Sequence, residues 1–233
     1  MFSVVFCGSL KAAISSYAAR SWPEAEQLFH QDPRWLGADA AFSAPLGNGR
    51  TIWLFGDTFV ANSEAHVRSE SEMVRNSVAI QQGSDPRSAT IAFSWRKDAD
   101  GSPASYFPEN GKHWYWPGHA IRLAEGPLVI FLYVVTETPG KDLGFASTGY
   151  AIVVIDNPDS PAANWQPRIV EAAASAFDAI PSTSVVRDGD YVVALAIRHN
   201  GAHAGALVRY PAASLAKGDV SQAEWWADDG RGW

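Results

Sequence analysis

Two aspartates near the start of the chain, Asp39 and Asp57, are the residues best suited by type and spacing to do chemistry. The segment between them contains Gly47-Asn48-Gly49, a strong turn signal, because Asn and Gly tolerate the positive φ that tight hairpins require. The flanks of this turn are therefore predicted to pair, which places the two carboxylates on neighbouring strands of one hairpin. In such a pair one carboxyl can act as an acid and the other as a base or nucleophile.

Asp57 directly follows residues 50–55, an almost continuously apolar run that is typical of a strand buried on both faces. An acid at the end of a buried strand is costly to place without a reason. The alternative is that Asp57 only caps a turn with Gly56 and Thr58. We interpret Asp39 as the base or nucleophile and Asp57 as the acid or the pKa-tuning partner, and the residues leave open which is which.

Arg75 and Asn76 are predicted to bind substrate, because they open an apolar strand after the charged loop 64–72. The Arg75 guanidinium can bind a carboxylate through two parallel hydrogen bonds, and the Asn76 amide can both donate and accept. The alternative is that Arg75 lies on the surface and Asn76 in a turn.

Trp116 and His119 complete the predicted substrate-binding set. Trp116 ends the run Trp114-Tyr115-Trp116, whose apolar ring faces can stack on a planar or sugar ring, although the same residues also pack cores. His119 follows Pro117-Gly118 and can bind substrate or modulate an acid, whereas a histidine without a companion is more often structural.

One short helix is predicted over residues 21–34, with Ser21 as its N-cap and Pro23 in its first turn. Beyond it, strand-like runs alternate with Gly, Pro, Asn and Asp to the C-terminus. The runs form three copies of one pattern. In each copy two strands are joined by a tight turn, and two outer strands, joined by a Pro-bearing turn, follow them. The last strand of each copy is predicted to end at a tryptophan: Trp95, Trp165 or Trp225. Copies spaced by roughly 65 to 80 residues are typical of β-propeller blades, and a β-sandwich with similar hairpins is the alternative.

The sequence therefore predicts an all-β fold, a β-propeller with about three blades, preceded by a short helix. Because propellers usually have about four to eight blades, we expect an incomplete propeller with an open blade edge through which the chain could self-associate. Residues 21–233 are predicted to form this partial propeller domain. Residues 1–20 are predicted to be poorly ordered or the remnant of a targeting segment.

Composition narrows the possible partners. The net charge of −7 and the lack of a basic cluster argue against nucleic-acid binding. The single Cys7 has no partner for an internal disulfide, and no Cys or His spacing resembles a zinc site. We expect no cofactor and no metal, and the short apolar N-terminus does not predict a membrane-spanning segment.

Four ordered motifs resemble those of bacterial proteins with a domain of unknown function that are related to five-bladed propeller glycosidases, including endo-D-arabinanases. The motifs are Trp35-Leu-Gly-Ala-Asp-Ala-Ala-Phe-Ser, Trp53-Leu-Phe-Gly-Asp-Thr-Phe, Met73-Val-Arg-Asn-Ser-Val-Ala-Ile and Trp116-Pro-Gly-His-Ala-Ile. The similarity covers about residues 22–233. It implies a glycoside hydrolase acting on a furanoside or related polysaccharide, in a secreted or periplasmic setting. The alternative function is a non-catalytic carbohydrate-binding or scaffold propeller with a vestigial site.

Overall fold

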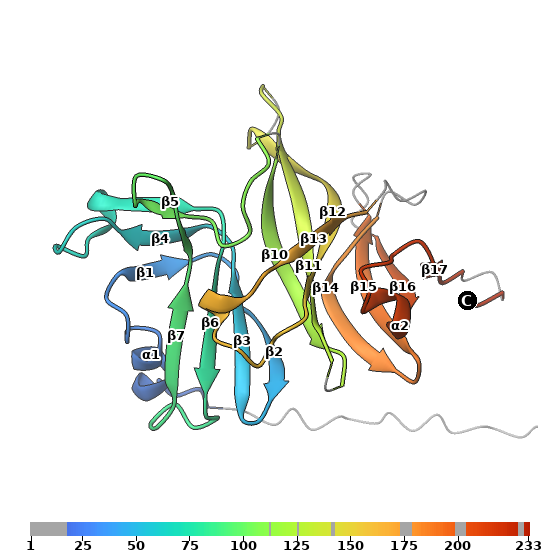
Figure 1. Ribbon diagram of the computed structural model, residues 1–233, viewed down its shortest axis with the longest axis horizontal. Helices are drawn as coiled ribbons and strands as arrows, with labels where there is room; N and C mark the ends of the chain where they lie inside the picture. The colour runs from blue at the N-terminus through green and yellow to red at the C-terminus, as the bar shows by residue number, and fades with distance from the viewer. Residues whose placement is uncertain are drawn as a thin grey trace, which may run out of the picture.

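Three four-stranded antiparallel sheets follow one another along the chain and from left to right in Figure 1. The computed structural model describes residues 18–111, 113–124, 126–140, 143–172, 179–198, 204–227 and 231–233. Most of the segment predicted as poorly ordered or a targeting remnant, residues 1–17, lies outside the described residues. The all-β fold class is confirmed.

Each sheet keeps its strands in chain order. The first sheet consists of β2 (Phe42–Gly47), β3 (Arg50–Phe55), β6 (Ser77–Gln82) and β7 (Thr90–Ser94). The central sheet consists of β10 (Trp114–Arg122), β11 (Leu128–Glu137), β12 (Phe145–Ile155) and β13 (Arg168–Glu171). The third sheet consists of β14 (Ala179–Asp188), β15 (Tyr191–Arg198), β16 (Gly205–Pro211) and β17 (Glu224–Trp225).

Smaller elements surround these sheets. A side sheet has the order β1 (Trp35–Ala38), β4 (Thr58–Ala61) and β5 (Ser71–Val74), and β8 (Arg96–Lys97) pairs with β9 (Pro103–Ala104). The helices are α1 (Pro23–Leu28) and α2 (Ala212–Leu215), with 3₁₀ turns η1 (Arg68–Glu70) and η2 (Ala162–Asn164).

The predicted hairpin forms between β2 and β3, with the positive φ angles at Asn48 (52°) and Gly49 (70°) that a type I′ turn requires. The predicted helix is shorter than expected. Its N-cap is Trp22 rather than Ser21, without a side-chain cap, and Pro23 occupies the first turn as predicted. In the second copy the prediction for Trp165 was wrong: this residue follows η2, and the outer strand begins only at Arg168.

The side sheet was not predicted. It is inserted into the first copy, because β4 and β5 leave the first sheet after β3 and the chain returns to it at β6. The predicted charged loop 64–72 is thus a β4–β5 connection with one 3₁₀ turn. This insertion sets the positions of both aspartates and of Arg75.

Two apolar layers hold the three sheets together. Along β11, Leu128, Ile130 and Leu132 face the first sheet, whereas Val129 and Phe131 face the third sheet. A strand with both faces covered reads as a continuous apolar run, because neither face meets water. The first strands also lie side by side, since β10 packs against β2 on one side and β14 on the other.

Asp159, on the loop between β12 and β13, joins the central sheet to the first sheet. Arg122 of β10 donates hydrogen bonds to both carboxylate oxygens of Asp159, at 2.9 and 2.7 Å. Arg50 of β3 pairs with the same carboxylate and donates to the backbone oxygen of Pro158 at 3.2 Å. We call these three side chains the inter-sheet clamp.

We expect Asp159→Asn to lower the free energy of unfolding at neutral pH but not in acid. Hydrogen bonding to Arg122 holds the pKa of Asp159 below its ordinary value. A group with a lowered folded-state pKa stabilises the fold above its unfolded pKa, and the stabilisation is lost as the pH falls through the folded pKa. The difference between wild type and variant should therefore shrink below about pH 4, the ordinary aspartate range.

Urea unfolding of both proteins across this pH range measures the effect. Asp156→Asn, on the same loop but outside the inter-sheet clamp, is the matched control. A difference between wild type and Asp159→Asn that stays constant from neutral to acid pH would contradict the ionic origin of the clamp.

Candidate functional site

Asp39 and Asp57 lie side by side on the two paired flanks of the turn at Asn48-Gly49, as the sequence predicted. Asp39 follows β1 and Asp57 precedes β4, and these two strands pair in the side sheet. The backbone N–H of Asp39 donates to the carbonyl of Asp57 at 2.9 Å, and the N–H of Gly56 donates to the carbonyl of Asp39 at 2.9 Å. The β1–β4 pairing continues the register of the β2–β3 hairpin past Asp39 and Asp57, and together the two pairings bring the aspartates side by side.

The local backbone turns sharply at this point. Ala40 has a φ of 59°, a left-handed conformation that is uncommon for a residue with a Cβ, and it redirects the chain from β1 into β2. Gly56 packs under Trp116, since a Cβ there would lie 3.7 Å from Trp116 Cδ1 and 3.6 Å from the Asp39 carbonyl oxygen. Trp116 of the central sheet is thus adjacent to both aspartates.

Each oxygen of the Asp57 carboxylate has its own partner. The indole N–H of Trp116 donates to Oδ1 at 2.9 Å, and Arg75 Nη1 lies 3.6 Å from Oδ2. The side chain of Asp57 keeps 20% of its surface exposed. Asp39, in contrast, is exposed and has no side-chain hydrogen bond or ion pair to any residue that the structure describes.

Arg75 connects Asp57 to a second carboxylate, Glu109. Its Nε lies 3.9 Å from Glu109 Oε1, and its guanidinium carbon lies 4.5 Å from the centre of the Trp114 ring. The backbone N–H of Arg75 donates to Ser105 Oγ at 3.0 Å, which fixes the chain at the end of β5. The arginine is thereby held on an indole face between two acids.

Sequence reasoning did not select Glu109. It lies on the irregular segment before β10, where a single acid between Pro108 and Asn110 reads as a solvated loop residue. No periodic pattern marks it, and only its contact with Arg75 connects it to the aspartates.

The aromatic residues of β10 form a cluster with Phe145 of β12. The rings of Trp116 and Phe145 meet edge to face with centroids 5.2 Å apart, and Trp114 lies 6.1 Å from Trp116 and 6.0 Å from Phe145. Trp114 is buried and Trp116 half-buried. The sequence left open whether these tryptophans pack the core or bind a ligand. Trp114 packs the core, whereas Trp116 retains an accessible part beside Asp57.

His119 is not in direct contact with the aspartates among the described contacts. It occupies the bulge of β10 between Pro117 and Ala120, and its ring partner is Phe42, 6.5 Å away. Burial lowers the pKa of His119 below the ordinary histidine value, which favours the neutral form of the ring. Its role in substrate binding stays a prediction.

The prediction for Asn76 as a substrate contact was wrong, because its side chain is fully buried and engaged by backbone groups. Nδ2 donates to the carbonyls of Phe107 and Tyr115 at 3.1 and 2.9 Å, and Oδ1 accepts the N–H of Phe107 at 2.6 Å. Asn76 is a positioning residue: it ties the segment before β10 to the start of β6, beside Arg75.

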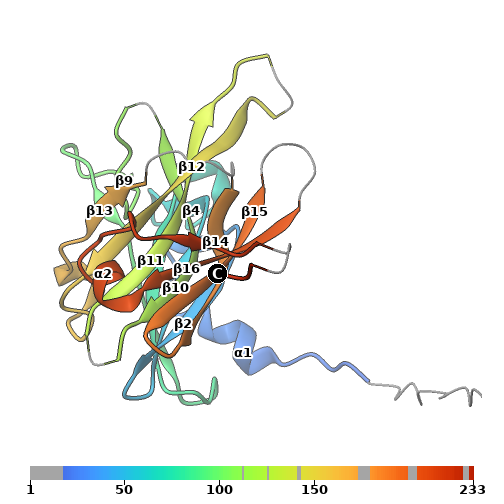
Figure 2. The same cartoon turned by 90° about the vertical axis from the view of Figure 1, so that its right-hand side faces the viewer.

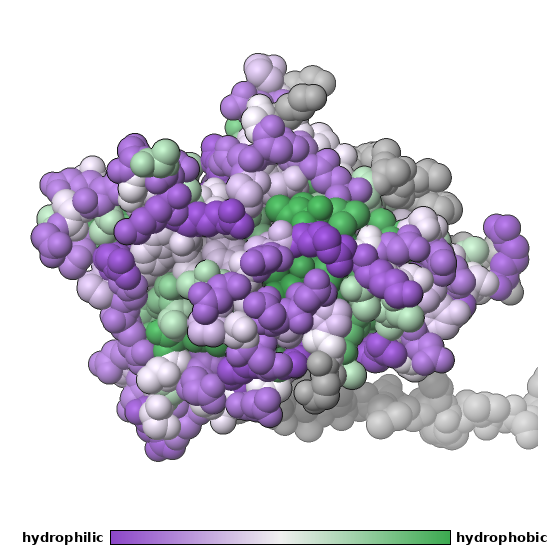
Figure 3. Space-filling model, in the orientation of Figure 1, coloured by the Kyte–Doolittle hydropathy of each residue, from purple (hydrophilic) through white to green (hydrophobic). Residues whose placement is uncertain are grey.

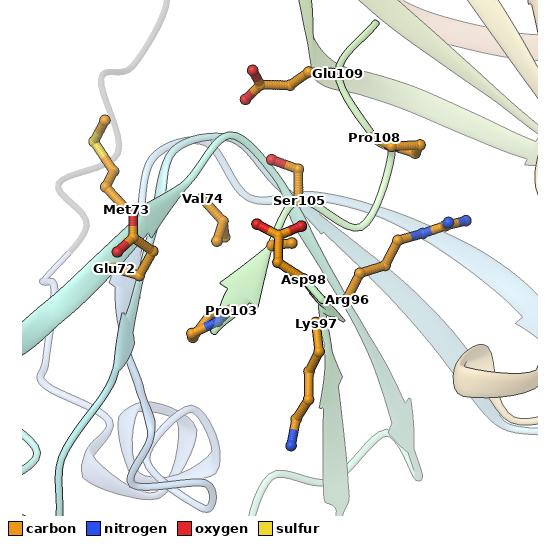
Figure 4. A pocket seen from close by; sticks show the side chains of 11 residues that line it. Glu72, Met73, Val74, Arg96, Lys97, Asp98, Pro103, Ser105, Pro108 and Glu109 are labelled. Atoms are coloured by element: carbon orange, nitrogen blue, oxygen red, sulfur yellow. The ribbon is translucent and has the colours of Figure 1, made fainter. Parts of the chain in front are cut away.

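A cleft of about 450 Å³ opens beside Arg75 (Figure 4). Ser105 and Glu109, which both contact Arg75, line it together with Glu72 and Asp98. In Figure 4 the side chain of Lys97 extends away from these carboxylates. The cleft has the size of a small-ligand site and adjoins the Asp57 cluster.

Two absences concern only the residues that the structure describes. Among them, no group of three or more His, Cys, Asp and Glu side chains could hold a metal ion. Within the same ranges, no helix has the length and apolarity needed to cross a membrane.

Comparison with known proteins gives a family and a similar fold. The family model described as DUF5005, a domain of unknown function, matches residues 24–226. A solved structure described as a "putative hydrolase" from Bacteroides ovatus superposes with a TM-score of 0.67 at 16% sequence identity. The match covers 91% of this chain and 56% of that protein, so the chain spans little more than half of its length. No curated protein matches the sequence.

Proposed function

We propose that this chain, which belongs to the DUF5005 family, is a glycoside hydrolase-type protein that acts on a furanoside or related polysaccharide. The observation that carries the proposal is the pairing of Asp39 with Asp57 beside the half-exposed indole of Trp116. Sugar hydrolysis needs two carboxyl groups, and an aromatic face is a common platform for a sugar ring. The fold shared with a protein described as a hydrolase is compatible with this chemistry.

We further propose that the three sheets are blades of a propeller of the five-bladed glycosidase type. The adjacency of β2, β10 and β14 supports this, because innermost strands of propeller blades surround a common axis. The saccharide partner, the absence of a required cofactor and a secreted or periplasmic location belong to the same proposal.

The geometry favours different roles for the two aspartates. Asp39 is exposed and free of side-chain partners in the described contacts, so its carboxylate can take a proton from water or attack the sugar carbon directly. Oδ1 of Asp57 accepts the indole N–H of Trp116 and Oδ2 faces the Arg75 cation, which suits Asp57 to orient and stabilise charge. The proton that the leaving oxygen needs then comes from Asp57 or from Glu109, the carboxylate on the other side of Arg75.

The reaction balances with these groups alone. The acid gives its proton to the glycosidic oxygen as the bond between that oxygen and the anomeric carbon breaks. Water supplies the new hydroxyl group, and its proton passes to the carboxylate that acts as base. At that point the acid is a carboxylate and the base carries a proton, so the acid takes up one proton from solvent and the base releases one to it before the next turnover.

The direct test is an assay for new reducing ends on furanoside and pyranoside polysaccharides with the wild type, Asp39→Asn and, as matched control, Asp85→Asn. Asp85 is a surface aspartate paired with Arg87. We expect hydrolysis that Asp39→Asn abolishes and Asp85→Asn leaves unchanged. Hydrolysis that persists in Asp39→Asn would contradict the proposed site.

A second candidate, a carbohydrate-binding protein without turnover, is favoured by one observation. Asp57 is held by Trp116 and Arg75, an arrangement that also suits a purely structural acid. Saccharide binding that Trp116→Ala weakens, without hydrolysis by the wild type, would support this candidate against the first.

A further inference from the structure

Two segments that the chain adds to the repeated four-stranded pattern build the cleft beside Arg75. One wall is β5 of the side sheet, which is inserted between β3 and β6, and the other wall is the β8–β9 hairpin (Figure 4). The hairpin belongs to a connection over residues 95–113, whereas the connection between the central and third sheets covers only residues 172–178. Added segments of this kind carry a large share of binding residues, because a rigid framework positions them.

The cleft lies next to the carboxylates of the candidate site. Glu109 lines the cleft, and its Oε1 lies 3.9 Å from Nε of Arg75. Nη1 of the same guanidinium lies 3.6 Å from Oδ2 of Asp57. Ser105 also lines the cleft and accepts the backbone N–H of Arg75. A saccharide chain bound at Asp57 can thus continue past Arg75 into the cleft.

The charges that the cleft offers to a ligand are negative. The carboxylates of Glu72 and Asp98 are exposed and have no hydrogen-bond or ion-pair partner among the residues that the structure describes. The two cations of the lining are turned elsewhere. Nε of Arg96 donates to the carbonyl of Tyr106 at 2.8 Å, and Lys97 extends away from the carboxylates in Figure 4. The available groups are therefore charged hydrogen-bond acceptors.

The surroundings of the cleft suit a polar ligand with some apolar surface. The side sheet lies at one end of the molecule, at the left of Figure 1 and behind the third sheet in Figure 2. In Figure 3 the surface over the side sheet is mainly hydrophilic, and the largest apolar area lies nearer the middle of the view. Val74, Pro103 and Pro108 line the cleft beside the carboxylates. A sugar unit matches this mixture, because its hydroxyl groups can donate to carboxylates and its C–H groups can pack on apolar side chains.

We propose that this cleft binds the sugar units next to the bond at Asp57, and that Glu72 and Asp98 make the protein selective for uncharged saccharides over uronates and sulfated saccharides. The inference rests on the proposed function, which supplies the saccharide. Ionised carboxylates accept hydrogen bonds from sugar hydroxyl groups. An anionic sugar would instead meet like charge, since Arg75 is already shared by Asp57 and Glu109. The volume of about 450 Å³ suits a short stretch of sugar units.

The test uses a linear arabinan in two forms of equal substitution, one with hydroxyethyl groups and one with carboxymethyl groups. The two substituents are similar in size and differ in charge. Calorimetry measures the affinity of the full chain for each form, and an assay for new reducing ends measures hydrolysis. We expect the wild type to bind the hydroxyethyl form roughly tenfold more tightly, as like charges a few ångströms apart predict. Added salt should reduce this preference.

The double variant Glu72→Gln with Asp98→Asn is expected to shift the two affinities in opposite directions. The neutral form should bind more weakly, because amide oxygens are weaker acceptors than carboxylates, and the carboxymethyl form should bind more tightly. The matched control is Asp85→Asn with Asp156→Asn, which removes the same charge outside the cleft and should keep the wild-type preference. This control excludes an effect of the net charge of −7.

Circular dichroism and thermal unfolding establish that the double variant is folded; if it is not, Glu72→Gln alone replaces it. Equal affinity of the wild type for both forms would overturn the inference, as would a preference that the double variant leaves unchanged. The expected preference without new reducing ends would contradict the proposed hydrolysis and support the selectivity of the cleft. Hydrolysis of both forms at equal rates would contradict the cleft assignment alone. A wild type that binds neither form would overturn both proposals.

Discussion

Replacement of Asp57 by asparagine is expected to lower turnover on a polysaccharide by roughly 10²- to 10⁴-fold, the usual contribution of a positioned acid–base group. The substitution removes a charge and almost no volume, so the hydrogen bond from Trp116 to Oδ1 can persist. Arg75 then loses the partner of its Nη1 and retains only Glu109. The expected loss is therefore in the rate constant kcat more than in KM.

The same experiment separates the two candidates for the acid. A substrate with a good leaving group, such as an aryl glycoside, needs little proton donation as its bond breaks. The variant that removes the acid, Asp57→Asn or Glu109→Gln, should lose polysaccharide hydrolysis but retain cleavage of the aryl substrate. Asp39→Asn should lose both, because the base or nucleophile is needed for either substrate.

The measurements are initial rates on both substrates for the three variants, with Asp85→Asn as control. Equal losses on both substrates for Asp57→Asn and Glu109→Gln would contradict an acid role for either. Wild-type rates in Asp57→Asn would remove this residue from the site.

The second large effect is on stability. Asn76→Ala is expected to lower the free energy of unfolding by about 3 kcal/mol or more, since each buried polar group left without a partner costs roughly 1–3 kcal/mol. Three backbone groups of Phe107 and Tyr115 lose their partner when this amide is removed. The cavity left in a fully buried position adds to the cost.

Urea unfolding of Asn76→Ala against the wild type measures this effect, with Asn157→Ala as matched control. Asn157 is exposed, and its side-chain amide donates to the carbonyl of Asn164 at 3.3 Å. Its replacement should change stability by no more than about 0.5 kcal/mol. A loss for Asn76→Ala as small as that of the control would contradict the positioning role.

Much of the fold is already determined by local patterns in the sequence. The turn at Asn48-Gly49 depends on two residues that adopt positive φ, and the apolar run of β11 is typical of a strand shielded on both faces. Such patterns act over a few residues, so they identify strands and hairpins wherever the chain places them. The three repeated four-stranded sheets follow from them.

The sequence predicted which residues belong to the candidate site better than it predicted how they are arranged. The sequence placed Asp39 and Asp57 on the paired flanks of one turn, and the backbone register confirms this, but Glu109 and its contact with Arg75 were not predicted. Asn76 was predicted to bind substrate, because an Asn at the start of a strand looks the same in sequence whether its amide meets a ligand or buried backbone groups.

What the sequence by itself determined is the class of each segment: the strands, the tight turn, the apolar layers and the acids at strand ends. What only the tertiary structure decided is which segments meet. Two contacts join residues that are distant in the chain: the β1–β4 pairing beside Asp39, and the bridge from Asp57 through Arg75 to Glu109. Backbone hydrogen bonds form equally well with any strand of suitable register, so the choice of partner comes from the packing of whole sheets.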